Sequence, residues 1–248
     1  MRLFGLIGYP LGHSFSKEYF TAKFLQEGIS DCRYELFQIE SVNELQSLIY
    51  QNPGLEGINV TIPYKRAVLS QLDDTSRIPA GLHACNCIRI LDHATIGYNT
   101  DIIGFEKSFS ANLKSNHKQA LLLGNGGAAE AVKWVLQKLG IYYRVVSRRI
   151  HDDSHLTYDN LRAEMLKDFQ VIINSTPLGT YPGIHECPPI PYEAITPDHY
   201  VYDLVYNPPK SLFLQKAEAQ GALIQNGYEM LVIQAEESWK IWNENRTH

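Results

Sequence analysis

The chain has 248 residues, of which 44% are hydrophobic and 20% charged, values typical of folded globular proteins. This composition excludes disordered and fibrous classes, and the length allows one large domain or two of ordinary size. The formal net charge is -5, and the sequence contains no long run of Lys or Arg that would indicate binding to nucleic acid or to a membrane. A small molecule is the expected partner.

Neither a secretory signal nor a membrane-spanning run is recognisable. Residues 1–12 lack a charged region followed by an extended apolar stretch, so a cytoplasmic location is expected. The four cysteines include no CxxC pair and no nearby His at zinc-ligand spacing, so we expect reduced thiols and no metal. Cys85 and Cys87 flank Asn86, and a half-buried strand is the favoured interpretation of that segment.

The first part of the chain alternates short apolar runs with amphipathic stretches, a pattern typical of an α/β domain with βαβ units. It predicts strands at 3–8, 33–39 and 57–62 and helices at 18–27 and 42–49. A Gly-containing segment at 100–105 then leads into a polar stretch at 108–119. We expect the chain to cross into a second domain there.

A second α/β series follows. It predicts strands at 119–123, 142–147, 171–175, 200–205 and 222–224, and helices at 128–139, 211–220 and 230–242. The run Gly124-Asn125-Gly126-Gly127-Ala128-Ala129 lies between the first of these strands and the first of these helices, and it fits the dinucleotide motif G-x-G-x-x-G/A. Gly124 would permit the tight turn and Gly126 would let the backbone approach a pyrophosphate at the helix N-terminus. The alternative is a glycine-rich turn that binds nothing.

The next predicted strand ends at Ser147-Arg148-Arg149, where an NAD site would place an acidic residue on the ribose hydroxyl. Guanidinium groups instead suit a 2′-phosphate, which favours NADP(H) over NAD(H). Two alternatives stay open: Asp152 or Asp153 could reach the ribose, or the arginines could lie on the surface without a ligand.

A polar strand face is predicted in the first domain. Strand alternation sends Ile58, Val60 and Ile62 to one side and Asn59 and Thr61 to the other. Lys65 follows shortly after the strand. This arrangement indicates a site for a small polar ligand.

At this point the sequence resembles the shikimate dehydrogenase family. The matching segments keep the family's order and spacing over nearly the whole chain. They are His13-Ser14-Phe15-Ser16, Asn59 to Lys65, Asn99-Thr100-Asp101, Gly124 to Ala128, Asn174 to Gly179, Asp203 to Pro208, and Gly227 with Met230 to Ala235.

The resemblance implies an α/β fold of two domains, an N-terminal substrate domain at 1–104 plus 229–248 and a Rossmann-type, doubly wound NADP domain at 105–228. It implies Lys65 and Asp101 as the catalytic pair. Substrate-binding residues would be Ser14, Ser16, Asn59, Thr61, Lys65, Asn86, Asp101, Tyr206 and Gln234. Cofactor-binding residues would be Gly124, Asn125, Gly126, Gly127, Ala128, Ser147, Arg148, Arg149, Thr176, Leu204, Gly227 and Met230.

Several residues depart from the family pattern. Lys17, Cys87, Tyr98 and Glu130 replace a proline, a threonine, an aspartate and an arginine, and none of these changes removes a proposed catalytic group. The segment after Gln234 is short, so we expect a reduced last helix.

The reaction implied is the reversible NADPH-dependent reduction of 3-dehydroshikimate to shikimate in chorismate biosynthesis. Lys65 would carry the proton and Asp101 would orient the Lys65 side chain, with the protonation state of Lys65 left open. The alternatives are a quinate or dual quinate/shikimate dehydrogenase and a non-catalytic NADPH-binding sensor. The sequence does not distinguish a monomer from a homodimer.

Overall fold

The computed structural model describes residues 1–12, 14–148 and 155–244. The chain divides into two compact units, Met1–Asp101 with Gln234–His248, and Ile102–Ile233. The domain boundaries predicted after 104 and before 229 lie a few residues from these, inside helices α3 (Asp101–Ser110) and α6 (Tyr228–Trp242). These two helices therefore carry the chain between the units.

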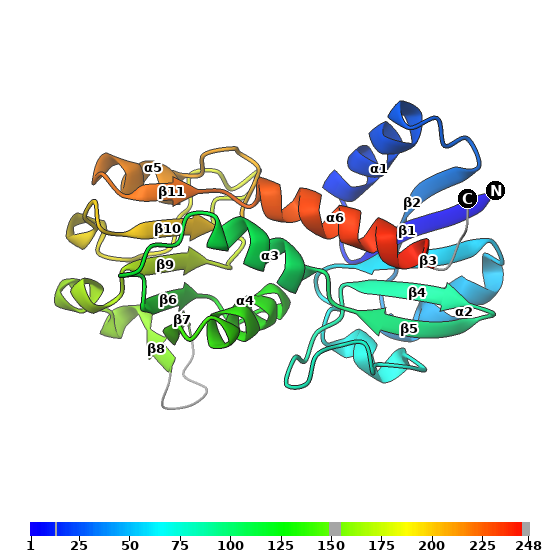
Figure 1. The fold of residues 1–248 in the computed structure, drawn as a ribbon, viewed down its shortest axis with the longest axis horizontal. Coiled ribbons are helices and arrows are strands. Elements are labelled where there is room, and N and C mark those ends of the chain that lie inside the picture. Colours follow the sequence, from blue (N-terminus) through cyan, green and yellow to red (C-terminus); the bar gives the residue numbers. More distant parts are fainter. Residues whose placement is uncertain (13, 149–154, 245–248) are drawn as a thin grey trace. The chain divides into compact units, whose positions relative to one another are not determined.

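The first unit contains a mixed five-stranded sheet in the order β2-β1-β3-β4-β5 (Figure 1). Strand β1 pairs in parallel with β2 and β3, whereas β4 and β5 form an antiparallel hairpin next to β3. The strands are β1 (Arg2–Gly8), β2 (Cys32–Gln38), β3 (Leu55–Val60), β4 (Cys87–Leu91) and β5 (Ala94–Tyr98). The helical elements are α1 (Phe15–Gln26), η1 (Val42–Glu44), α2 (Leu45–Gln51) and η2 (Ala67–Gln71).

The second unit contains a six-stranded sheet in the order β11-β10-β9-β6-β7-β8, and every pairing is parallel. The strands are β6 (Gln119–Leu123), β7 (Tyr142–Ser147), β8 (His155–Thr157), β9 (Val171–Asn174), β10 (Tyr200–Asp203) and β11 (Leu223–Gln225). The helical elements are α4 (Gly127–Lys138), η3 (Tyr158–Asn160), η4 (Ala163–Asp168), η5 (Tyr192–Ala194) and α5 (Leu212–Ala219). The order reverses between β6 and β9, which is the doubly wound Rossmann arrangement and confirms the predicted fold class.

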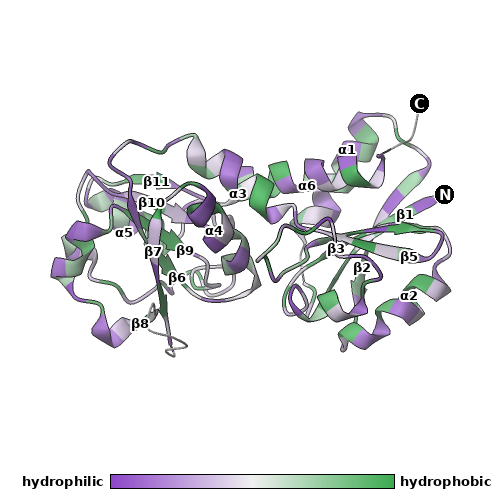
Figure 2. Cartoon of the chain, turned by 60° about the horizontal axis from the view of Figure 1, so that its bottom comes forward, coloured by the Kyte–Doolittle hydropathy of each residue, from purple (hydrophilic) through white to green (hydrophobic). Residues whose placement is uncertain are grey.

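The central strands of this second sheet are hydrophobic along their length (Figure 2). Leu121, Leu122 and Leu123 of β6 are fully buried, as is the whole of β9. Parallel strands with both faces covered have continuous apolar sequences because neither face meets water. The carboxyl ends of these strands hold the turns that the sequence marked as cofactor-binding.

Helix α6 is anchored in the first unit by its C-terminal tryptophan. The Trp242 ring stacks on Phe4 with centroids 4.9 Å apart, and its Nε1 donates to the carbonyl of Ile88 at 3.0 Å. Gln234 and Ser238 lie on the same helix, so this packing fixes their position relative to the first sheet. The helix runs to Trp242, as the sequence predicted.

The structure differs from the sequence-based expectation in two details. Strand β3 ends at Val60, and Ile62 is 65% exposed instead of sharing the buried face of Ile58 and Val60. The chain turns immediately after the strand, so the period-2 pattern no longer applies there. Residues 101–110 form helix α3, a helix that was not predicted where the Gly-containing segment leads into the polar stretch.

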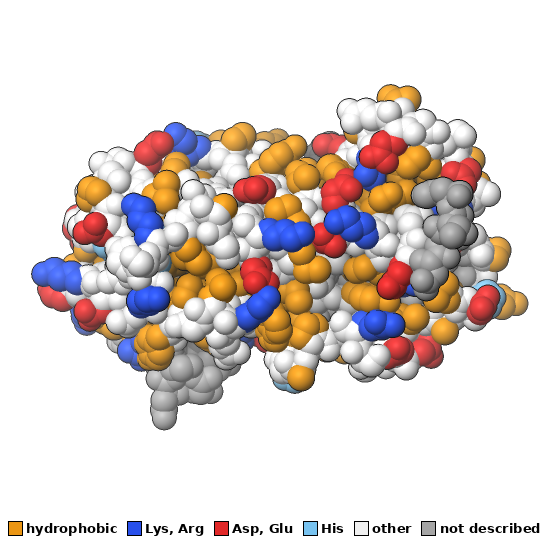
Figure 3. Space-filling model, viewed as in Figure 1, with side chains coloured by type: hydrophobic (Ala, Val, Ile, Leu, Met, Phe, Trp, Pro, Cys, Tyr) orange, Lys and Arg blue, Asp and Glu red, His pale blue; other side chains and the backbone are white. Residues whose placement is uncertain are grey.

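The surface shown in Figure 3 has Lys and Arg side chains interspersed with Asp and Glu, so this face has no extended basic patch. Among the described residues, no helix has both the length and the apolar character needed to cross a bilayer.

Candidate active site

Lys65 and Asp101 form an ion pair in the first unit. Lys65 lies in the turn after β3, and its Nζ is 2.7 Å from Oδ2 of Asp101, the first residue of α3. The two side chains are 15% and 6% exposed, so the pair is largely shielded from water. The structure therefore brings together the two residues predicted to be catalytic.

Asn86 holds the other oxygen of this carboxylate. Its Nδ2 donates to Oδ1 of Asp101 at 2.9 Å and to Oε1 of Gln234 at 3.1 Å. Its Oδ1 accepts from the backbone N–H of Thr100 at 2.6 Å. Asn86 is 2% exposed, and its buried amide links α3, α6 and the start of β4.

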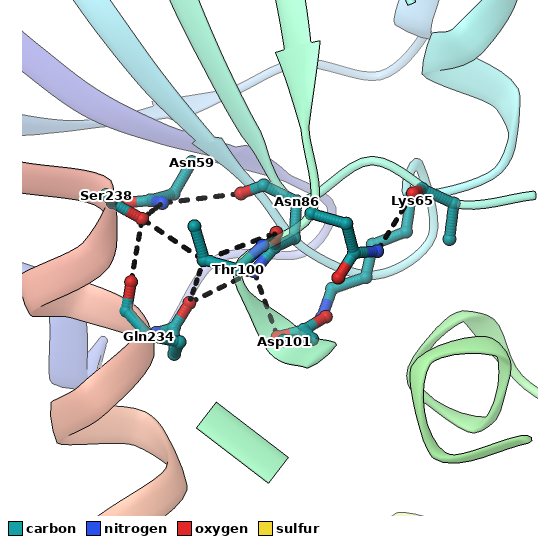
Figure 4. Close-up of polar contacts among 9 residues, drawn as sticks. Asn59, Lys65, Asn86, Thr100, Asp101, Gln234 and Ser238 are labelled. Atoms are coloured by element: carbon teal, nitrogen blue, oxygen red, sulfur yellow. Dashed lines mark hydrogen bonds and ion pairs between the residues drawn. The ribbon is translucent and has the colours of Figure 1, made fainter. Parts of the chain in front are cut away.

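Asn59 is the third buried amide in this cluster (Figure 4). Its Oδ1 accepts from the hydroxyl of Tyr34 at 2.8 Å, and its Nδ2 donates to the Ser238 hydroxyl at 2.9 Å. Ser238 also lies 3.3 Å from Oγ1 of Thr100. Tyr34, Thr100 and Ser238 were absent from the predicted site, and burial raises the pKa of Tyr34 well above its usual value.

The remaining predicted substrate residues of this unit lie at the ends of its elements. Ser14 precedes α1 and makes no side-chain cap hydrogen bond, and Ser16 lies in the first turn of that helix. Thr61 follows β3 and is half-buried. A helix N-terminus with hydroxyl side chains suits a carboxylate, because its unpaired backbone N–H groups point at the anion. His13 of the same motif is outside the described residues.

In the second unit, the glycine-rich turn has the shape that a pyrophosphate site needs. Gly124 has φ +101°, and a Cβ at this position would lie 2.8 Å from Oγ of Ser175. Helix α4 begins at Gly127, and its N-cap, Gly126, supplies no side-chain cap. A Cβ at Gly126 would meet nothing within 4 Å, so the backbone there is open to a ligand. These observations fit a dinucleotide phosphate.

The predicted 2′-phosphate residues follow β7. Ser147 is the last residue of the strand and is buried, whereas Arg148 is exposed. Arg149, like Asp152 and Asp153 of the alternative interpretation, is outside the described residues. Arg148 therefore carries the structural case for NADP at this position.

The residues predicted for the nicotinamide pocket all follow carboxyl ends of strands in the second unit. Thr176 follows β9, Leu204 follows β10, and Gly227 follows β11 just before α6, which carries Met230. Tyr206 also belongs to this unit and is half-buried, whereas the other predicted substrate residues belong to the first. In a doubly wound sheet, ligands bind at this edge.

Comparison with known proteins shows the family to which this chain belongs. Residues 6–88 match the family model described as the shikimate dehydrogenase substrate binding domain. An NADP(+) shikimate dehydrogenase of Methanococcus maripaludis is 35% identical over 97% of this chain and 91% of its own. The chain belongs to the shikimate dehydrogenase family. Crystal structures of shikimate dehydrogenases resemble it as well. That from Aquifex aeolicus has a TM-score of 0.84 and 30% identity, covering 100% of this chain and 94% of its own. The structure from Thermus thermophilus, solved with NADP(H) and shikimate, has a TM-score of 0.82 and 25% identity. It covers 98% of this chain and 93% of its own.

Residues that depart from the shikimate dehydrogenase pattern have partners within this chain. Lys17 pairs with Glu35 at 2.8 Å, and Glu130 in the first turn of α4 pairs with Lys133 at 2.5 Å. Cys87 is buried, and burial raises the pKa of its thiol.

Proposed function

We propose that this protein is an NADP-dependent shikimate dehydrogenase that interconverts 3-dehydroshikimate and shikimate. The observation that carries the proposal is the shielded Lys65–Asp101 ion pair beside the buried amides of Asn59 and Asn86, in a chain of this family. Amide groups both donate and accept hydrogen bonds, so such a cluster suits a ligand with several ring hydroxyls.

The substrate carboxylate binds the hydroxyls of Ser14 and Ser16 at the start of α1. Its ring hydroxyls bind the amides of Asn59, Asn86 and Gln234, with Thr61 and Asp101 as further partners. Asn86 holds Asp101 and Gln234 before a ligand binds, and such preorganisation lowers the entropic cost of binding.

The cofactor's pyrophosphate binds the glycine turn, and Arg148 binds the 2′-phosphate. Thr176, Leu204, Gly227 and Met230 surround the nicotinamide, with Tyr206 nearby. When bound, NADPH supplies the hydride for reduction of the ketone.

Lys65 supplies the proton. Reduction of a ketone leaves negative charge on its oxygen, and a cation within hydrogen-bond reach of that oxygen stabilises the charge. The Lys65 ammonium donates to this oxygen and transfers the proton, while Oδ2 of Asp101 keeps the ammonium oriented. In the reverse direction, the Lys65 amine accepts the proton of the substrate hydroxyl.

The direct test measures NADP⁺ reduction by the purified protein with shikimate, with quinate, and without substrate. We expect turnover with shikimate and much less with quinate. Comparable turnover with both would assign a dual dehydrogenase. NADP⁺ binding without any substrate-dependent reduction would overturn the proposal in favour of a cofactor sensor.

A further inference from the structure

Asp203, the last residue of β10, has a fully buried carboxylate in the second unit. Its Oδ1 accepts two hydrogen bonds, from Nδ2 of Asn174 at 2.9 Å and from the backbone N–H of Val205 at 3.0 Å. Its Oδ2 accepts from the hydroxyl of Ser211, the N-cap of α5. A single side chain thus connects three segments at the carboxyl edge of the sheet.

The first connection leads through Asn174 to the glycine turn. Asn174 is the register partner of Asp203 on β9, and its Oδ1 accepts from both N and Oγ1 of Thr176, at 3.0 and 2.6 Å. An added Cβ on Gly124 would lie 2.9 Å from Cγ2 of Thr176, so the turn packs directly against this side chain.

The second connection leads through Val205 to the start of α6. The Val205 carbonyl accepts from the N–H of Gly227 at 3.2 Å. An added Cβ on Gly227 would lie 2.2 Å from the carbonyl oxygen of Leu204, so the two backbones touch. The hydrogen bond from the Val205 N–H to Asp203 therefore fixes the turn against which the Gly227 backbone packs.

We propose that Asp203 is a positioning residue for the nicotinamide end of the cofactor. It contacts none of the cofactor itself. Its Oδ1 sets the Asn174–Thr176 loop on one side and the Leu204–Val205 turn on the other, and these segments carry the nicotinamide-lining residues. The inference rests on the proposed function only in taking NADP as the cofactor.

The chemistry of the carboxylate explains why this residue type stands here. An ionised carboxylate only accepts hydrogen bonds, so it forces Asn174 to present Nδ2 towards it and Oδ1 towards Thr176. An asparagine at 203 could present its own Nδ2 and allow the Asn174 amide to reverse. Burial raises the pKa of Asp203 to about 6, and the hydrogen bonds from Ser211, Val205 and Asn174 oppose that rise. The hydrogen bonds therefore offset only part of the desolvation free energy of the buried carboxylate.

The test compares binding of NADP⁺ and of 2′,5′-ADP, which keeps the adenosine and the 2′-phosphate but lacks the nicotinamide mononucleotide half, by titration calorimetry on the full chain. Asp203→Ala should weaken NADP⁺ binding by roughly tenfold, because the Asn174–Thr176 loop and the Leu204–Val205 turn lose their common hydrogen-bond acceptor and must be ordered when the nicotinamide binds. Binding of 2′,5′-ADP should change by less than about threefold. Ser211→Ala is the matched control, since it removes the Oδ2 bond and leaves Oδ1 intact. It should lower the melting temperature without changing the affinity for NADP⁺.

Asn174→Ala gives a second route if Asp203→Ala does not fold. It removes one connection only and should show the same preference for weakening NADP⁺ over 2′,5′-ADP. Unchanged NADP⁺ affinity in these variants, or equal losses for both ligands, would overturn the inference. Failure of the proposed function would look different, because the wild type would then bind NADP⁺ and show no turnover with shikimate.

Discussion

Asn86 donates to Oδ1 of Asp101 at 2.9 Å, while Lys65 occupies Oδ2 of the same carboxylate at 2.7 Å. Because Asn86 is itself bound to the backbone N–H of Thr100, the protein holds the Asp101 carboxylate at a fixed rotation. The direction of the Lys65 ammonium is set in turn. Orientation of the proton donor is thus a property of the folded chain, and substrate binding does not have to create it.

Lys65→Ala should lower kcat by roughly 10²- to 10⁴-fold, the usual contribution of a positioned acid or base. KM for shikimate should change much less, because the hydroxyl and amide ligands remain. Steady-state kinetics with shikimate and NADP⁺ measure both quantities. Lys240→Ala, on the exposed side of α6, is the control and should leave them unchanged. Wild-type turnover in the Lys65 variant would remove Lys65 from the chemistry.

Ser238→Ala should raise KM for shikimate several-fold with a smaller change in kcat. The substitution removes the 2.9 Å partner of Asn59 Nδ2 and leaves that nitrogen with only its longer bond, 3.3 Å to the Asn86 carbonyl, so the amide is held less firmly. Ser108→Ala is a matched control, since both serines are fully buried and both donate to the carbonyl four residues earlier at 2.8 Å. Ser108 lies in the second unit and bonds to Tyr202 of that same unit, so its loss should affect stability alone. Equal KM effects in the two variants would contradict a specific role for Ser238.

Arg148→Ala should weaken the binding of NADPH far more than the binding of NADH, because only NADPH carries the 2′-phosphate that a guanidinium would bind. Equilibrium titrations of both cofactors give the ratio directly. Arg162, which is also exposed in the second unit, provides the control variant Arg162→Ala. Equal losses of NADPH and NADH affinity would place the 2′-phosphate elsewhere.

The dinucleotide turn was predictable because its signals are local. The apolar run of β6, the glycines and the stripe of α4 all lie within residues 119–138, and the motif's physical requirements concern the backbone alone. Strand β5 was missed, since Gly97 weakens its strand pattern. The glycine is required by packing, because a Cβ added at Gly97 would lie 2.5 Å from Cδ1 of Leu72.

The polar cluster of the first unit was predictable only in part. Lys65, Asn86 and Asp101 were found through family motifs, whereas Ser238 was not. Its partner Asn59 lies 179 residues away in the sequence, and no local pattern predicts a contact between residues so far apart. One signal was present: Ser238 stands four residues after Gln234, on the same helix face, and a small polar residue there indicates a buried polar contact.

Asp203→Asn should change how stability depends on pH. Burial raises the pKa of Asp203 from 3.8 to about 6 in the folded state, so the folded protein holds this proton more tightly than the unfolded chain does. Raising the pH from 3.8 to about 6 then costs the wild type stability, up to about 3 kcal/mol from this group. The variant lacks that loss. Its free energy of unfolding relative to wild type, from urea titrations, should rise across this interval and level off above it. A constant difference would show that Asp203 titrates normally.

His117→Asn tests an acid-sensitive position in the second unit. His117 is 3% exposed and stacks on Tyr200, its Nδ1 accepts from the Lys114 N–H at 3.1 Å, and its Nε2 has no partner among the described residues. Burial lowers the pKa of His117, and the charge of Lys114 lowers it further. The folded state therefore favours the neutral ring, so the wild type should lose stability as pH falls below the ordinary value of 6.5.

Asparagine can accept the same backbone hydrogen bond without titrating, so the His117→Asn variant should lose less stability over that pH range. Urea unfolding followed at a series of pH values measures the difference in slope. His83→Asn is the control, because His83 is exposed and its replacement should leave the slope at the wild-type value. A variant at 117 with the wild-type slope would mean that the buried imidazole is protonated as easily in the folded state as in the unfolded chain.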